Sequence, residues 1–132
     1  MAKAINWPLR FRQIVLGEDD QSLHSAFRPN RLYFDGGYWV DGERVDIRVN
    51  HLVTRKAHIV GDLELCALKD LSEDVLKRHK PGVQTMAEVL TYLQEVYPEA
   101  HVTPETLLTV VTYRNEPVDE TIIERTSSDP HM

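Results

Sequence analysis

Basic and aromatic side chains gather in the first half of the chain, and their chemistry suits a ligand more than any other group does. Six of them lie between residues 28 and 48: Arg28, Arg31, Tyr33, Trp39, Arg44 and Arg48. Guanidinium groups bind phosphate oxygens and aromatic rings stack on bases, so this combination is typical of sites for single-stranded nucleic acid or a nucleobase. The alternative is a solvated strand surface on which acidic neighbours neutralise the arginines. Those neighbours are Asp35, Asp41, Glu43 and Asp46.

The overall charge limits how such a site could work. The chain carries 15 Lys or Arg and 21 Asp or Glu, a net charge of −6. Residues 1–60 hold nine basic and seven acidic side chains, while residues 61–132 hold six and fourteen. Neutralisation of phosphates dominates the affinity for duplex DNA, so an acidic protein is a poor non-specific DNA binder. Any contact with a polyanion is therefore expected in the first half.

The other reactive side chains form no recognisable catalytic or metal-binding pattern. The six histidines have no ligand-type spacing from cysteine or from one another, so no metal or other cofactor is expected. His51 and His58 could still meet across neighbouring strands. Cys66 is the only cysteine, which excludes an internal disulfide, and no evident base accompanies it. The catalytic residues, if there are any, stay unknown from the sequence.

The length and composition fit one globular domain. The chain has 132 residues, of which 42% are hydrophobic and 27% charged. We expect a single domain over residues 1–115 and an acidic, mobile tail over residues 116–132, where little can be buried. No apolar run reaches the roughly 20 residues that span a bilayer, and the first residues lack a signal-peptide core. The expected location is the cytoplasm, with no membrane contact.

Strand patterns fill the middle of the chain. A short helix is expected after Pro8, and the polar segment 17–30 that follows predicts a loop. The aromatic segment 31–42, interrupted by Gly36-Gly37, predicts a strand, a turn and a second strand. Segments 43–50 and 56–71 alternate apolar and polar residues, as half-buried strands do, with Gly61 as a bulge or corner.

Two helices and a closing strand follow. Ser72 can cap a short helix, and Thr85 with Glu88 forms a capping box that opens a longer one. The apolar face of the longer helix comprises Met86, Val89, Leu90, Leu93, Val96 and Tyr97. The β-branched segment 106–114 predicts a buried strand that pairs with segment 56–68 or with an earlier one. This order is an α+β pattern, and we expect the sheet to curl into a small mixed barrel that buries its edges.

Residues 43–113 resemble an ASCH domain, of the PUA-like superfamily. The resemblance is carried, in order, by Leu71-Ser72-Glu73, His79, the helix from Thr85 to Tyr97, Tyr97-Pro98 and the apolar closing strand. It implies a small PUA-like, ASCH-type mixed β-barrel with flanking helices.

The branch of that family most similar in length and C-terminal layout is the small acetylcytidine amidohydrolases. Those enzymes carry a Gly-x-Lys-Thr motif ahead of an arginine, and use the Lys, a nearby Thr and a later Glu. The matching segment here runs from Gly17 to Arg28 and contains neither Lys nor Thr. The later Glu would fall near Pro81, where no carboxylate stands. The resemblance therefore implies the fold and not the activity.

The leading functional hypothesis is a PUA-like binding domain for RNA, a nucleotide or a modified nucleoside. Its cleft would be lined by segment 17–31 and the first strands. One alternative is a small hydrolase or nuclease that acts on such ligands through unidentified residues. Another is a protein-interaction module that uses the acidic tail.

Overall fold

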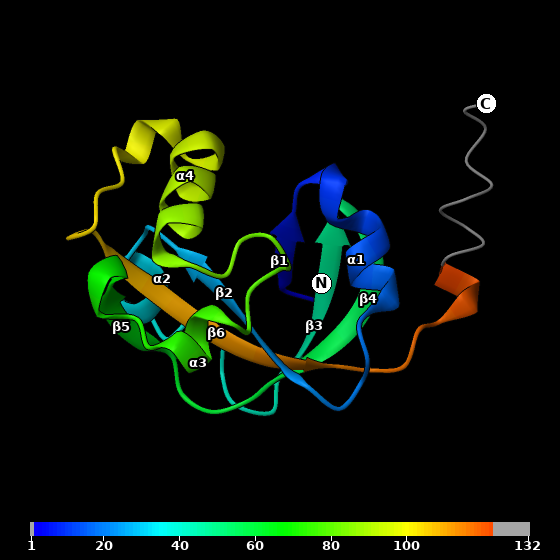
Figure 1. Ribbon diagram of the computed structural model, residues 1–132. Coiled ribbons are helices and arrows are strands. Elements are labelled where there is room, and N and C mark those ends of the chain that lie inside the picture. Colours follow the sequence, from blue (N-terminus) through cyan, green and yellow to red (C-terminus); the bar gives the residue numbers. More distant parts are fainter. Residues whose placement is uncertain (1, 123–132) are drawn as a thin grey trace.

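The computed structural model describes residues 2–122 and has a mixed α+β fold, in which one six-stranded sheet is accompanied by short helices (Figure 1). The strands are β1 (Ala4–Trp7), β2 (Leu23–Arg28), β3 (Arg44–Val49), β4 (Leu52–Ile59), β5 (Glu64–Ala67) and β6 (Leu107–Asn115). The α-helices are α1 (Arg12–Gly17), α2 (Leu32–Asp35), α3 (Glu73–Leu76) and α4 (Met86–Val96). Single 3-10 turns stand at Leu9–Phe11, Leu68–Asp70 and Pro98–Ala100.

The long strand β6 runs through the middle of the sheet. The strand order is β1-β3-β4-β6-β2, and β5 also pairs with β6. All pairings are antiparallel except that of β1 with β3. The predicted closing strand is thus confirmed, because it pairs with the middle segment through β4 and β5 and with an early segment through β2.

The sheet stays open along one seam. Strands β1 and β2 end the strand order β1-β3-β4-β6-β2, and no strand pairing within residues 2–122 joins them. The closed barrel expected from the sequence is therefore not formed by these pairings. One side chain crosses the seam instead: Nη2 of Arg28, at the end of β2, donates to the carbonyl oxygen of Asn6 in β1 over 3.0 Å.

Two predicted segments have a different structure. The segment 17–30 contains β2 and is not the predicted loop, because Ala26 and Phe27 are buried and the Ser25 hydroxyl bonds that of Thr112 over 2.9 Å. The aromatic segment 31–42 forms α2, so its predicted strands are wrong. The Asn30 side chain accepts a hydrogen bond from the Leu32 amide over 2.9 Å, which satisfies a free donor at the start of this turn.

The continuous strand expected over 56–71 is divided. Strand β4 ends at Ile59 and β5 begins at Glu64, and Gly61 between them has a φ of 78°. That value is readily adopted by glycine, so Gly61 lies at a corner as predicted. The short helix after Pro8 is confirmed as the turn Leu9–Phe11 running into α1.

Both predicted helix caps are confirmed. Ser72 accepts from the Val75 amide, and Thr85 with Glu88 forms a capping box. On the apolar face of α4, Val89 and Leu93 are fully buried as predicted, while Met86, in the first turn, is 42% exposed. Its assignment to the buried face is wrong.

The segment after β6 is described as far as residue 122. Glu116 pairs with Arg44 and His58, and Ile122 is buried. The rest of the predicted mobile tail lies outside the described residues. No helix within residues 2–122 combines the length and the apolar character needed to cross a lipid bilayer.

Candidate ligand-binding cleft

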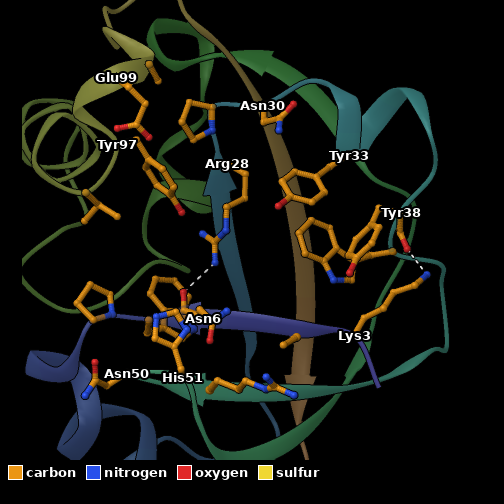
Figure 2. A pocket seen from close by; sticks show the side chains of 18 of the residues that line it. Lys3, Asn6, Arg28, Asn30, Tyr33, Tyr38, Asn50, His51, Tyr97 and Glu99 are labelled. Atoms are coloured by element: carbon orange, nitrogen blue, oxygen red, sulfur yellow. Dashed lines mark hydrogen bonds between the residues drawn. The ribbon is translucent and has the colours of Figure 1, made fainter. Parts of the chain in front are cut away.

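A cleft of about 880 Å³ opens beside the seam between β1 and β2 (Figure 2). Its walls come from four places: β1, the segment from Arg28 to Trp39, the turn between β3 and β4, and the end of α4. The lining residues are Ala2, Lys3, Ala4, Asn6, Trp7, Pro8, Arg28, Pro29, Asn30, Tyr33, Tyr38, Trp39, Arg48, Asn50, His51, Val96, Tyr97, Glu99 and Ala100.

Arg28 lies at the centre of this cleft. Its side chain is 7% exposed, and its guanidinium donates to the carbonyl oxygens of Phe27 (3.2 Å) and Asn6 (3.0 Å). Among the described residues no carboxylate forms an ion pair with it. Carbonyl oxygens carry no net charge, so the positive charge of Arg28 is not neutralised. Figure 2 shows its side chain between Tyr97 on one side and Tyr33 on the other.

Three aromatic rings form one wall. Tyr33 stacks on Trp39 with 4.8 Å between ring centroids, and Tyr38 meets both rings edge-on. The Lys3 ammonium lies 4.8 Å from the centre of the Tyr38 ring. Trp39 is only 4% exposed, so its indole backs the Tyr33 ring, which is the more accessible of the two. Tyr33 lies in α2, and the start of this helix is held by the hydrogen bond from the Leu32 amide to the Asn30 side chain.

Tyr97 forms the opposite wall. It ends α4, where its amide donates to the carbonyl oxygen of Leu93 over 2.8 Å, and the following Pro98 cannot continue the helix. Glu99, one turn beyond, also faces the cleft. The sequence predicted Tyr97 as part of the apolar helix face and as the helix end, but not as a residue of the cleft.

Amide groups and a hairpin turn complete the rim. Asn6, Asn30 and Asn50 all line the cleft and offer hydrogen-bond donors and acceptors. Asn50 and His51 form the two-residue connection between β3 and β4 with φ values of 52° and 66°. Two-residue hairpin turns favour such positive φ values, and both asparagine and histidine adopt them more often than most residues. The Asn50 amide donates to the Trp7 carbonyl oxygen over 2.9 Å, which holds the turn against β1.

The six residues singled out from the sequence divide into two groups. Arg28, Tyr33, Trp39 and Arg48 line the cleft, whereas Arg31 and Arg44 do not. Arg31 is paired with Asp35 over 3.1 Å and Arg44 with Glu116 over 2.8 Å. Arg31 and Arg44 therefore match the alternative in which acidic neighbours neutralise arginines on a solvated surface.

Arg48 is intermediate between the two groups. It lines the cleft, but its Nη2 lies 3.5 Å from a carboxylate oxygen of Asp46, which also pairs with Lys56. Lys3 likewise forms an ion pair with Glu43 over 3.1 Å. Arg28 thus differs from Lys3 and Arg48, the other lysine and arginine that line the cleft.

A second cluster of charged groups lies inside the protein. Lys80 is 1% exposed, and its Nζ lies 2.7 Å from Oε2 of Glu18 and 3.3 Å from the Tyr113 hydroxyl. Asn115 donates to the other Glu18 oxygen over 3.2 Å, and Nδ1 of His24 lies 3.6 Å from Oε2. Burial lowers the pKa of Lys80, and the charge of Glu18 opposes that shift. None of these residues lines the cleft.

Burial opposes the charged forms of His79 and Cys66. His79 stacks on Phe27 at 4.9 Å and meets Trp7 edge-on, and burial lowers its pKa to about 3. It is therefore neutral at ordinary pH. His51 and His58 lie at opposite ends of β4 and do not meet as the sequence allowed. Burial raises the pKa of the Cys66 thiol. Within residues 2–122, no three His, Cys, Asp or Glu side chains are grouped so that they could hold a metal ion.

Comparison of the chain with protein-family models, with curated proteins and with solved structures gave no match to any of them.

Proposed function

We propose that the cleft binds a ligand built on nucleobases, either a nucleotide or a segment of single-stranded RNA. The observation that carries this proposal is Arg28, a guanidinium that pairs with no carboxylate of the described chain and lies between the tyrosines of two walls. A cation for a phosphate beside aromatic rings for bases is how proteins hold single-stranded nucleic acid.

The remaining features of the cleft support the same class of ligand. A volume of about 880 Å³ lies within the range of small-molecule sites. The side chains of Asn6, Asn30 and Asn50 at the rim suit hydrogen bonds to base edges. Since Lys3 and Arg48 in the cleft are paired with carboxylates, a duplex with many phosphates would find little to neutralise it.

We also propose that the fold is of the PUA-like, ASCH type. The order of the capped helix, the Tyr97-Pro98 end and the long strand β6 supports it. The seam between β1 and β2 would then be the place where the barrel is closed by a side chain, Arg28, and not by strand pairing.

The hydrolase alternative gains little support from the charged groups. The amidohydrolases that the chain resembles carry a Lys in the segment that matches residues 17–28 and a Glu near position 81. Here an acid, Glu18, lies near the first place and a base, Lys80, near the second. Because this ion pair is enclosed and lies outside the cleft, it supports a role in the fold and not in catalysis.

The test is a titration of the protein with mononucleotides and with short single-stranded RNA at two salt concentrations, followed by the fluorescence of Trp7 and Trp39. We expect binding of RNA that weakens as salt rises, because bound phosphate releases counterions. Arg28→Ala should weaken binding by about tenfold or more, a change of about 1.4 kcal/mol.

The matched control is Arg31→Ala, which removes an arginine that is paired with Asp35 outside the cleft. Its affinity should equal that of the original protein. Arg28→Lys retains the charge and serves if Arg28→Ala does not fold. If a folded sample bound neither nucleotides nor RNA, the proposal would be wrong and the protein-interaction alternative would stand.

A further inference from the structure

The cleft has two separate aromatic walls, and between them lies Arg28, whose charge no carboxylate of residues 2–122 neutralises. Tyr97 comes from the end of α4 and Tyr33 from α2, and Arg28 rises between them from the end of β2 (Figure 2). We infer that the cleft holds two consecutive nucleotides of a single RNA strand, with one base on each wall and their linking phosphate at Arg28. This inference rests on the proposed function and specifies its ligand.

The walls are independent of each other. Tyr33 is supported by the stacked Trp39 at 4.8 Å and the edge of Tyr38 at 5.2 Å, so its ring direction is fixed before any ligand arrives. Tyr97 caps the end of α4 and is partly buried against the hydrophobic core. A rigid ring that is already in place loses little entropy when a base stacks on it. Each wall can therefore hold a base of its own.

The charges of the cleft fit one phosphodiester. Lys3 is paired with Glu43 and Arg48 lies beside Asp46, which leaves Arg28 as the cation of the described cleft that no carboxylate neutralises. A phosphodiester carries a single negative charge, which one guanidinium can match. Glu99 lies next to Tyr97 and would repel a further phosphate on that side.

The volume of the cleft agrees with a ligand of two nucleotides. Pockets for drug-sized ligands range from about 300 to 1,000 Å³, and the cleft, at about 880 Å³, lies near the upper end of that range. A single nucleotide would leave one of the two walls uncovered. Two linked nucleotides would cover both.

The experiment compares uridine, uridine monophosphate, the dinucleoside monophosphate UpU and a tetranucleotide of uridine by calorimetric titration. UpU should bind about tenfold more tightly than uridine monophosphate, because the second base gains a stacking partner. The tetranucleotide should gain little over UpU. The affinity for UpU should fall with salt with a logarithmic slope of about −0.7, the value for one phosphate contact on a single strand.

Variants separate the two walls. Tyr33→Leu and Tyr97→Leu should each bring the affinity for UpU down to about that for uridine monophosphate. Phe34→Leu is the matched control, since Phe34 is an exposed aromatic residue of α2 that does not line the cleft, and it should change nothing. Circular dichroism of each variant checks that it is folded.

Three other results of the titrations are possible, and they contradict the two-nucleotide inference either alone or together with the proposed function. Equal affinities for uridine monophosphate and UpU would overturn the two-nucleotide inference while the proposed function stood. A steady gain in affinity and salt slope from UpU to the tetranucleotide would overturn it in favour of a longer track. Failure of all four ligands to bind a folded protein would remove the proposed function and the inference together.

Discussion

Trp7 lies against two cations whose surroundings differ. Nζ of Lys80 is 4.2 Å from the centre of the indole, and the guanidinium carbon of Arg28 is 5.5 Å from it. Lys80 is matched by the carboxylate of Glu18, whereas Arg28 is held by two carbonyl oxygens. Both are almost fully buried, so burial alone does not distinguish them.

The partner, not the burial, separates a structural cation from one that is available to a ligand. A buried charge that is matched by an opposite charge is stable only within that pair, and removing one member leaves the other uncompensated. A buried charge that is held by neutral carbonyls at the floor of a cleft still attracts an anion. Replacing the two cations should therefore have different effects: a larger loss of stability for Lys80 and a loss of ligand affinity for Arg28.

The largest expected effect is on stability, from Lys80→Met. The variant removes the ammonium that lies 2.7 Å from the buried Glu18 carboxylate, and we expect a loss of about 3–5 kcal/mol in the free energy of unfolding. Urea denaturation measures it. The double variant Glu18→Gln with Lys80→Met should recover much of the loss, since no charge then stays unpaired. A loss below about 1 kcal/mol in the single variant would mean that the pair is not buried.

Acid should destabilise the protein through His79, which lies beside the same Trp7. Burial lowers the pKa of His79 from 6.5 to about 3, so between these values the unfolded chain binds a proton that the folded protein does not. Stability should therefore fall as pH decreases from about 6.5 to about 3, by up to about 1.4 kcal/mol per pH unit from this group. Urea denaturation at several pH values checks it. His79→Gln should have a shallower slope over that interval, and an unchanged slope would contradict the assignment.

Arg28→Ala should destabilise the fold less than Lys80→Met. The variant removes the charged hydrogen bond to Asn6, worth about 1.5–3 kcal/mol, and a longer one to the adjacent Phe27, but leaves no opposite charge behind. The same denaturation experiment gives the value. A loss equal to that of Lys80→Met would show that the seam between β1 and β2 is a main support of the fold, and the contrast between the two cations would then fail.

The smallest effect is expected from Arg44→Ala. Arg44 is exposed and paired with Glu116, and exposed ion pairs contribute little to stability. Neither the denaturation midpoint nor the affinity for RNA should change measurably. A loss of RNA affinity would mean that the ligand extends from the cleft along the exposed side of β3.

Local patterns in the sequence were enough for some elements and not for others. Strands β3 and β6 follow from alternation and β-branching, and the Ser72 and Thr85 caps follow from single side chains. Strand β2 could not be predicted in this way. Its polar Ser25 is buried against Thr112, which lies 87 residues further along the chain, and this partner is known only from the fold.

The candidate site was only partly predictable for the same reason. Tyr33 and Arg28 follow from residue type, and the pairing of Arg31 with Asp35 could have been inferred from their helical spacing. The pairing of Arg44 with Glu116 could not, since 72 residues separate them. Tyr97 and Asn50 reach the cleft through the end of α4 and the turn after β3, and nothing in their immediate neighbours marks them as ligand residues.

The central place of β6 in the sheet has a consequence for synthesis on the ribosome. Strands β1, β3 and β4 pair with one another, so they can assemble as soon as residue 59 has emerged. Strand β2 is made earlier than β4, yet its partner β6 begins only at Leu107. At roughly 5–20 residues per second, the ribosome takes several seconds to reach that strand. Ala26 and Phe27 stay uncovered for that time, so we expect the nascent chain to hold a folded three-stranded unit while β2 waits, open to chaperones, for β6.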